Sequence, residues 1–277
     1  MTRMTGTPIR ALLLDIDGTL LPQGRVGVSQ PIIDRVRRMR NDGVTIVVAT
    51  GRSGFVIGPA LLGSFEADYY ICSNGAEVLD AAGSRLYEQR FTEDQLLRLT
   101  SRCEGGRITL LFAFADGYGA YAGYERYQRV LRERQDQAVS NEGGYAGWIR
   151  NCPQRDRHRG GLPFGAVVYG APEEITQLVS EGVKGLQLVP FCPGGADVYR
   201  REVDKAETAR WLMDRIGIPM SQTAAAGDGN NDLPLFEAAG VAVAMGNARP
   251  ALKRAADFIV GPAEQDGLLE AFDLLKL

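Results

Sequence analysis

The sequence predicts an α/β protein in which a Rossmann-like, doubly wound parallel sheet forms the core and carries an inserted α+β domain. Toward both ends of the chain, short apolar runs alternate with amphipathic helical patterns, as expected for a parallel sheet covered by helices. Between these regions, apolar runs flank turn residues and indicate antiparallel strands. Acidic or small polar residues directly follow several of the apolar runs.

The first part of the chain contains three predicted buried strands, at residues 9–14, 44–49 and 69–72. Their nearly continuous apolar character is typical of strands covered on both faces. A helix is predicted between the first two strands, with Ser29 as its N-cap and Gly43 as its stop signal. A short helix is predicted before the third strand. This succession predicts the first half of the parallel sheet.

The middle of the chain changes pattern at residue 77, where two short apolar segments flank Asp80-Ala81-Ala82-Gly83 and predict a hairpin. Further helices are predicted at 92–103, 126–134 and 172–181, and further strands at 108–114, 118–122, 164–169 and 186–191. This mixture predicts the inserted α+β domain.

The parallel pattern returns near Asp204, which forms a predicted capping box with Glu207 at a helix start. Strands are predicted at 223–226 and 241–244. We therefore expect residues 1–79 and 191–277 to form a catalytic core, and residues 80–190 to form an inserted cap domain that determines substrate specificity.

The composition argues against a nucleic-acid-binding, a membrane-spanning or a disulfide-rich protein. The chain has 277 residues, 45% of them hydrophobic, and a formal net charge of −3, so no global basic field attracts nucleic acid or anionic lipid. No apolar run approaches the roughly 20 residues of a membrane span, and residues 1–10 lack the apolar stretch of a signal peptide. Four widely spaced cysteines fit reduced thiols better than disulfides or a zinc site. We expect a cytoplasmic protein.

The segment from Arg126 to Arg159 is rich in arginine and contains the single histidine, His158. It has two interpretations: a solvated helix and loop, or a cationic wall that meets an anionic substrate.

Polar residues at the ends of the predicted strands carry the functional argument. Ligands of open α/β sheets bind at the carboxyl ends of the strands. The residues at those ends are Asp15, Asp17, Thr50, Asn74, Asp228 and Asp232. Carboxylates that converge at one sheet edge repel each other unless a cation lies between them. Oxygen ligands favour Mg²⁺, which usually acts on phosphates.

Phosphoryl chemistry at such a site requires three kinds of group. A carboxylate serves as the nucleophile, and a second carboxylate serves in turn as proton donor and base. Positive charge and hydrogen-bond donors stabilise the phosphoryl oxygens. Lys205, at a predicted helix start, and Thr50-Gly51 are the candidates for that third role.

With these residues in view, the sequence resembles the haloacid dehalogenase superfamily of aspartate-nucleophile phosphatases. Asp15-Ile16-Asp17-Gly18-Thr19 matches the first motif of that superfamily, Thr50 the second, Lys205 the third, and Gly227-Asp228-Gly229-Asn230-Asn231-Asp232 the fourth. The insertion between the second and third motifs resembles the large α/β cap of the Cof-type subfamily, class IIB. Ser73-Asn74-Gly75-Ala76 and Ala244-Met245-Gly246-Asn247-Ala248 also resemble that subfamily.

The resemblance implies a role for each matching residue. Asp15 would attack phosphorus, and Asp17 would act as general acid and base while giving its backbone carbonyl to Mg²⁺. Thr50 and Lys205 would bind the phosphoryl group. Metal ligation would come from Asp15, Asp17 and Asp228 with Asp232 in support, and phosphate or substrate contacts would come from Gly51, Arg52, Asn74 and Asn231.

Several of these residues also have ordinary structural interpretations. Lysine at a helix start is commonly a surface residue, although the helix dipole disfavours it there. Arg52 is equally consistent with a substrate contact and with a surface ion pair. Asn74 can stabilise the turn before Gly75, and Asn231 can cap a helix.

The sequence therefore predicts a Mg²⁺-dependent phosphatase that hydrolyses a small phosphomonoester, such as a sugar phosphate, through an aspartyl-phosphate intermediate. A phosphomutase of the same superfamily and a non-catalytic protein that binds a phosphorylated metabolite are the alternatives. We expect a monomer or homodimer whose partner is a small phosphorylated metabolite. The identity of that metabolite depends on the cap, whose sequence is the least informative.

Overall fold

The computed structural model describes residues 8–105, 107–133 and 148–277, with only the backbone described for residues 130–133. Part of the arginine-rich segment lies outside the described residues. The chain forms two compact units: one comprises the chain up to Tyr87 and from Asp204 onward, and the other comprises Glu88–Val203. Among the described residues, no helix combines the length and apolar character needed to cross a bilayer.

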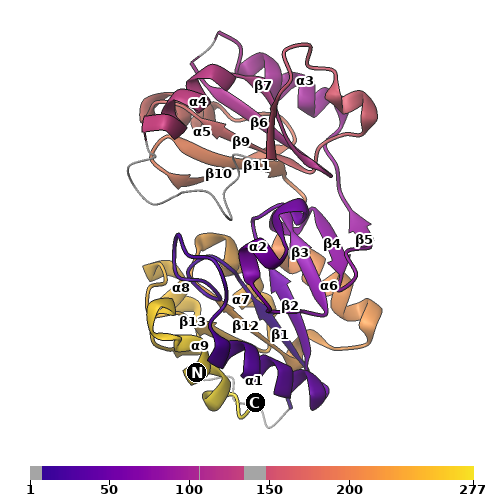
Figure 1. Cartoon of the computed structure of the whole chain (residues 1–277), viewed down its shortest axis with the longest axis vertical. Coiled ribbons are helices and arrows are strands. Elements are labelled where there is room, and N and C mark those ends of the chain that lie inside the picture. The colour runs from indigo at the N-terminus through magenta and orange to yellow at the C-terminus, as the bar shows by residue number, and fades with distance from the viewer. Residues whose placement is uncertain (1–7, 106, 134–147) are drawn as a thin grey trace. The chain divides into compact units, whose positions relative to one another are not determined.

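The first unit is built on an eight-stranded sheet in the order β14-β13-β12-β1-β2-β3-β4-β5 (Figure 1). The strands are β1 (Ala11–Leu14), β2 (Thr45–Ala49), β3 (Tyr69–Cys72), β4 (Glu77–Asp80), β5 (Arg85–Glu88), β12 (Thr223–Gly227), β13 (Val241–Ala244) and β14 (Phe258–Ile259). All pairings from β14 to β3 are parallel, and β4 pairs with β3 antiparallel. The carboxyl ends of six strands therefore meet at one edge.

Helices cover both faces of this sheet, which confirms the doubly wound prediction. The helices are α1 (Gln30–Asn41), α2 (Pro59–Leu62), α6 (Lys205–Ile216), α7 (Leu233–Ala238), α8 (Pro250–Ala255) and α9 (Gly267–Leu274). Leu12 and Leu14 pack with residues of α1 and α9 on one face, whereas Leu13 packs with residues of α6, α7 and α8 on the other. Alternate side chains of β1 thus reach opposite cores, which explains its continuous apolar run.

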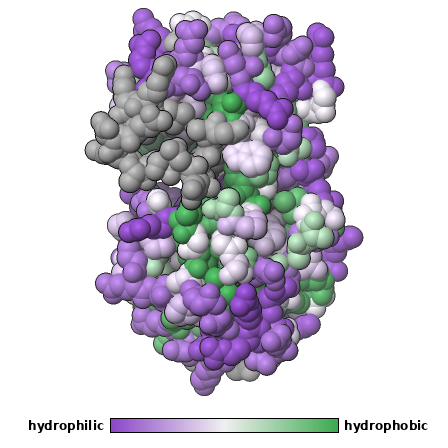
Figure 2. Space-filling model, viewed as in Figure 1, coloured by the Kyte–Doolittle hydropathy of each residue, from purple (hydrophilic) through white to green (hydrophobic). Residues whose placement is uncertain are grey.

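The outer side of α1 is polar. Its apolar side chains, among them Ile32 and Val36, are buried, whereas Asp34, Arg37 and Arg38 are exposed. Figure 2 shows the mostly hydrophilic surface that results over this helix. The amphipathic pattern read from the sequence is therefore the one that the fold uses.

The second unit contains a six-stranded sheet in the order β10-β11-β9-β6-β7-β8. Its elements are α3 (Glu93–Arg102), β6 (Thr109–Phe114), β7 (Gly117–Ala122), α4 (Tyr124–Glu133), β8 (Ile149–Asn151), β9 (Gly165–Tyr169), α5 (Pro172–Glu181), β10 (Leu186–Cys192) and β11 (Gly195–Arg200). The pairings are antiparallel apart from β7 with β8. Phe91, Phe112 and Tyr121 lie in its apolar core.

The structure moves both predicted domain boundaries. The turn after β4 and β5 itself were assigned to the inserted domain, but β5 lies beside β4 in the core sheet, and β4 pairs with β3 from Cys72↔Glu77 to Tyr69↔Asp80. Residues 191–203 were assigned to the core, but β11 pairs with β9 and β10. The boundaries fall at 87/88 and 203/204 instead of 79/80 and 190/191, because strand pairing decides membership of a sheet.

Two predicted helix caps also differ in the structure. Ser29 occupies the N-cap of α1 but makes no capping hydrogen bond, and its buried Oγ has no partner. Asp204 does cap α6 by accepting from the Glu207 N–H at 2.8 Å. The Glu207 carboxylate pairs with Arg210 instead of completing a capping box.

Candidate active site

Apart from Lys205, the first residue of α6, the predicted site residues of the core lie in the segments after β1, β2, β3 and β12. Leu14 of β1 lies opposite Val48 of β2 and Ala226 of β12 in the parallel register. The loops that follow these strands therefore start at the same level. This arrangement brings together motifs that are far apart in the sequence.

Three carboxylates form the centre of the site. Asp15, Asp228 and Asp232 each offer one oxygen, and these oxygens lie within 4.8 Å of one another. Asp15 and Asp232 are almost completely buried, whereas Asp228 is half-buried. Such a set of oxygen donors is suited to a divalent cation.

Lys205 lies against two of these carboxylates. Its Nζ donates to Asp15 Oδ1 at 2.7 Å and to Asp232 Oδ1 at 2.6 Å, and its side chain is 0% exposed. The interpretation of Lys205 as a surface residue is therefore wrong. Its position at the first residue of α6 is stabilised by the two carboxylates, which offset the unfavourable helix dipole.

The pKa values reflect this crowding. Burial, with the added repulsion of Asp232, raises the pKa of Asp15 well above its usual value, and Lys205 opposes that shift. Burial and Asp232 likewise raise the pKa of Asp228 to about 6. Burial by itself would lower the pKa of Lys205, but Asp15 and Asp232 raise it. Lys205 thus compensates the carboxylates only in part, and a bound divalent cation would offset the remaining repulsion.

Asp232 is occupied by protein donors at both oxygens. Besides the contact to Lys205, its Oδ2 accepts from the backbone N–H groups of Asp228 at 3.2 Å and Gly229 at 3.0 Å. A Cβ at Gly227 would lie 2.5 Å from the same oxygen, so the loop requires glycine there. Asp15 and Asp228 are therefore the better candidates for direct metal ligands, with Asp232 holding the loop and Lys205.

Asp17 pairs with Arg52. The guanidinium donates to both carboxylate oxygens, from Nε at 2.7 Å and from Nη2 at 2.6 Å. The Asp17 side chain is 44% exposed, whereas that of Arg52 is 14% exposed. Of the two interpretations of Arg52, the structure shows the ion pair, and its partner is a predicted catalytic residue.

A second polar cluster joins the loops after β2, β3 and β12. The Asn231 side-chain amide donates to Asn74 Oδ1 at 3.0 Å, and the Asn74 N–H donates to the Thr50 carbonyl at 3.0 Å. A Cβ at Gly51 would lie 3.2 Å from the Asn74 amide. Asn231 does not cap α7, because Asp232 holds the N-cap position. The predicted phosphate-binding residues Thr50, Gly51, Asn74 and Asn231 thus form one contiguous group.

Asn247 is a site residue without a role in the sequence prediction. Its Nδ2 donates to the Gly18 carbonyl at 2.8 Å and to Asp228 Oδ2 at 3.1 Å, and its Oδ1 accepts from the Ala263 N–H at 3.0 Å. A Cβ at Gly18 would lie 2.2 Å from Asp228 Oδ2. Asn247 therefore ties Asp228 to the loop after β1. In the sequence, Asn247 belongs to the segment 244–248 that resembles the Cof-type subfamily, but that resemblance did not indicate its contact with Asp228.

Other reactive residues lie outside this cluster. Burial raises the pKa values of the Cys72 and Cys103 thiols, that of Cys103 to about 12, which fits packed rather than nucleophilic cysteines. His158 contacts the Tyr121 hydroxyl at 3.1 Å within the second unit.

In the described part of the arginine-rich segment, several arginines pair with carboxylates of the second unit. Arg155 pairs with Glu104, and both Arg150 and Arg157 pair with Asp116. These contacts favour the interpretation of this part as a solvated surface rather than a cationic wall.

Comparison with known proteins places this site in a family. The family model of haloacid dehalogenase-like hydrolases matches residues 12–272. A putative phosphatase of Bacillus subtilis is 26% identical over 97% of this chain and 98% of its own length. A putative bifunctional phosphatase/peptidyl-prolyl cis-trans isomerase of Streptococcus pyogenes is 27% identical over 97% of this chain, which spans only 54% of that relative.

Solved structures agree with the sequence comparison. A phosphatase of this superfamily from Bacteroides thetaiotaomicron superposes with a TM-score of 0.84 at 25% identity, covering 97% of this chain and 96% of its own. A subclass IIB sugar phosphatase of the superfamily has the same fold, with a TM-score of 0.79 at 22% identity and coverage of 96% and 99%. The chain therefore belongs to the haloacid dehalogenase-like hydrolases, and its predicted assignment as a Cof-type phosphatase of that superfamily is confirmed.

Proposed function

We propose that this enzyme is a Mg²⁺-dependent phosphatase that hydrolyses a small phosphomonoester through an aspartyl phosphate on Asp15. The observation that carries the proposal is the buried contact of Asp15 with Lys205, beside Asp228. Buried carboxylates at a strand end, compensated by one lysine and able to share a cation, suit attack on an anionic phosphoryl group.

The reaction divides into two displacements. A carboxylate oxygen of Asp15 attacks phosphorus, the bond from phosphorus to the ester oxygen breaks, and Asp17 gives a proton to the departing alcohol. Asp17 then takes a proton from water, which attacks the phosphorus of the acyl phosphate. Inorganic phosphate leaves, and Asp15 regains its carboxylate.

The ion pair with Arg52 constrains the first displacement. Both carboxylate oxygens of Asp17 accept from the Arg52 guanidinium, so neither oxygen can exchange a proton with the leaving group while this pair is intact. Arg52 therefore has to release Asp17 during the cycle. The phosphoryl oxygens of the substrate would compete with Asp17 for the Arg52 guanidinium. Arg52 would therefore exchange Asp17 for the substrate, which is the substrate contact predicted for it.

The remaining residues bind the metal and the phosphoryl group. Asp15, Asp228 and the backbone carbonyl of Asp17 would hold Mg²⁺, supported by Asp232. Bound there, Mg²⁺ would supply positive charge to the phosphoryl oxygens. We propose Thr50, Gly51, Asn74, Lys205 and Asn231 as the donors for those oxygens.

The unit formed by residues 88–203 would determine specificity. It is inserted between the second and third motifs, and none of the predicted catalytic residues belongs to it. A subclass IIB structural neighbour is named a sugar phosphatase, and a 23% identical Bacillus subtilis relative is named a phosphatase of 5-amino-6-(5-phospho-D-ribitylamino)uracil. Both names support a small phosphorylated metabolite, with a sugar or sugar-like phosphate as our proposal.

A phosphate-release screen over metabolites, with Mg²⁺ and with a chelator, tests the function. We expect Mg²⁺-dependent release by the wild-type protein and a loss of at least about 10³-fold in Asp15→Asn, because the nucleophile is removed. Asp68→Asn, a change remote from the site motifs, serves as the control. A wild-type rate of phosphate release in Asp15→Asn would contradict the assignment of Asp15 as the nucleophile. A wild-type rate in the presence of the chelator would contradict the requirement for Mg²⁺.

A further inference from the structure

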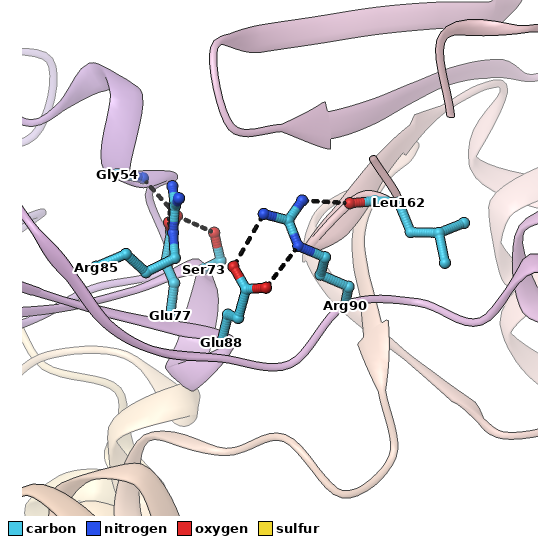
Figure 3. A network of polar contacts seen from close by, with 7 residues as sticks. All are labelled: Gly54, Ser73, Glu77, Arg85, Glu88, Arg90 and Leu162. Atoms are coloured by element: carbon cyan, nitrogen blue, oxygen red, sulfur yellow. Dashed lines mark hydrogen bonds and ion pairs between the residues drawn. The ribbon is translucent and has the colours of Figure 1, made fainter. Parts of the chain in front are cut away.

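A buried carboxylate outside the proposed chemistry lies at the start of β4. Glu77 is 1% exposed, and four donors surround it (Figure 3). Its Oε1 accepts from the Gly54 N–H at 2.9 Å and from the Ser73 hydroxyl at 3.3 Å. Its Oε2 accepts from Arg85 Nε at 3.2 Å and Nη2 at 3.1 Å. Burial of a charge is unfavourable unless such partners compensate it.

The partners of Glu77 belong to three different segments of the first unit. Gly54 follows the Thr50-Gly51-Arg52 loop, Ser73 begins the turn that contains Asn74, and Arg85 begins the edge strand β5. A Cβ at Gly54 would lie 3.0 Å from Glu77 Oε1, so the loop lies directly against the carboxylate. Glu77 therefore connects the two loops that carry the predicted phosphate-binding residues to the edge of the sheet.

The turn after β3 has an unusual backbone. Ser73, Asn74 and Gly75 have φ angles of +52°, +56° and +111° in succession. Left-handed conformations are unfavourable for residues other than glycine, and they persist only where the surroundings fix them. Here the Ser73 N–H donates to the Arg52 carbonyl at 2.8 Å and the Asn74 N–H to the Thr50 carbonyl at 3.0 Å, while Glu77 holds the Ser73 side chain.

We propose that Glu77, held by Arg85, is a positioning residue that fixes the Thr50-Gly51-Arg52 loop against the turn at residues 73–75. Glu77 touches none of the reacting groups. Its two carboxylate oxygens fix the distance between the loop and the turn. The Ser73 and Asn74 N–H groups, which donate to the loop, then fix the position of Asn74 relative to Thr50. The kinetic consequence rests on the phosphatase function proposed above, whereas the structural consequence does not.

A second contact between a carboxylate and an arginine lies at the end of β5. Arg85 pairs with Glu77 in the first unit, whereas the Glu88 carboxylate accepts from Arg90 at 3.1 and 2.9 Å, and Arg90 donates to the Leu162 carbonyl at 2.7 Å (Figure 3). Glu88→Gln changes a carboxylate of β5 whose contact with Arg90 does not include Glu77, and it serves as a comparison for general effects on this part of the chain.

The chain offers a matched control at Asp68. Its Oδ2 accepts from the Ile46 N–H at 2.8 Å, and its Oδ1 accepts from Arg40 at 3.0 and 2.8 Å. A carboxylate that receives one backbone N–H and one arginine thus occurs in both networks. Asp68 precedes β3, at the opposite end of the same sheet, so loss of its contacts affects stability without touching the phosphate loop.

The experiment compares Glu77→Leu and Glu77→Gln with Asp68→Asn and Glu88→Gln. Hydrogen exchange by mass spectrometry is followed in peptides covering residues 50–56 and 73–77. Hydrolysis of p-nitrophenyl phosphate and its inhibition by inorganic phosphate provide KM, kcat and Ki. Glutamine keeps an oxygen acceptor for the Gly54 N–H and gives up the charge that pairs with Arg85, so it remains informative if the leucine variant does not fold.

We expect Glu77→Leu to lose exchange protection in both peptides and to raise KM and the phosphate Ki at least about tenfold, because misplaced binding groups lose their alignment. Glu77→Gln should show the same changes to a smaller extent, about threefold. Arg85→Met should resemble Glu77→Gln, and Arg85→Lys should recover part of the loss.

The control variants decide between positioning and general stability. Loss of folded protein lowers kcat while KM and Ki stay constant, as expected for Asp68→Asn. The proposal is overturned if the Glu77 variants keep wild-type protection at residues 50–56, or if Asp68→Asn raises the phosphate Ki equally. If the wild-type protein hydrolyses no phosphomonoester, the proposed function fails, and the exchange data alone decide the positioning role.

Discussion

The two ends of the core sheet use the same chemical groups in different ways. At the amino ends of the strands, individual carboxylates join neighbouring segments: Asp68 accepts from the Ile46 N–H and pairs with Arg40, and Asp257 accepts from the Ala242 N–H at 3.0 Å. At the carboxyl ends, Asp15, Asp228 and Asp232 crowd together, and Lys205 pairs with Asp15 and Asp232.

The unfavourable electrostatic interactions are therefore found at the carboxyl ends of the strands. Asp68 and Asp257 at the amino ends each join two neighbouring segments of the sheet. The crowded carboxylates raise the pKa values of Asp15 and Asp228, a cost that folding alone does not require. Unfavourable clusters of this kind are concentrated at functional sites, where a ligand compensates them.

Removing the lysine from the crowded end should have the largest effect on stability. Lys205→Met leaves Asp15 and Asp232 buried without their cation, and loss of one member of a buried ion pair typically costs about 3–5 kcal/mol. We expect a decrease of that size in the free energy of unfolding, measured by urea denaturation with a chelator present. An unchanged midpoint would mean that the carboxylates are protonated in the folded protein.

Asp228→Asn should separate activity from stability. Phosphate release should fall about 10²-fold or more, because a proposed metal ligand is lost, and Mg²⁺ should no longer raise the melting temperature. In the metal-free protein the folded-state pKa of Asp228 is about 6, against an unmodified value of 3.8. Folding therefore favours the protonated form, and the stability it contributes at low pH is lost as pH rises from about 4 through 6.

The pH dependence gives the control for this variant. With a chelator, the wild-type protein should be less stable at pH 8 than at pH 5 by up to about 1 kcal/mol from this group, after allowance for its partial exposure. Asp228→Asn should lack that component. Parallel stability curves for the two proteins across this pH range would contradict the raised pKa.

Asn247→Ala, also at the carboxyl ends of the strands, should reduce Mg²⁺ affinity and have a smaller effect than Asp228→Asn. The variant keeps every carboxylate but frees Asp228 from the loop after β1, so metal affinity should fall about tenfold, as for other residues that orient metal ligands. The measurement is the Mg²⁺ concentration for half-maximal phosphate release. If excess Mg²⁺ restores the rate, Asn247 orients the ligand; if the rate stays low at every Mg²⁺ concentration, it acts elsewhere.

Asp68→Asn should have the smallest effect on function. The Asp68 side chain is 30% exposed, and its loss should cost about 1 kcal/mol of stability. Phosphate release per folded molecule should match the wild-type protein. Reduced turnover at full folding would mean that the two ends of the sheet are not independent.

Much of the site was predictable because its residues directly follow predicted strands in the sequence. An apolar strand followed by Asp15 and Asp17, or by Asp228, places those side chains at the carboxyl edge whatever the rest of the chain does. The order of parallel units in the core was predictable for the same reason. The roles of these residues remain predictions, whereas their convergence is now a structural fact.

Other features depended on contacts between distant residues. Lys205 reaches Asp15 across 190 positions of the sequence, and its neighbours in the sequence do not show which carboxylates it contacts. Asn247 and Glu77 look like ordinary polar residues until their partners are known. The β4–β5 hairpin has the same local pattern in either domain, so only its pairing with β3 assigns it.

The sequence by itself determined the α/β core, the inserted domain and the candidate nucleophile Asp15, because hydrophobic periodicity and strand-end placement are local properties. The tertiary structure decided where the domains divide, that Asp232 holds Lys205 and its own loop, and that Arg52 holds Asp17. These outcomes depend on distances and burial between separate segments, and only the packed chain fixes them.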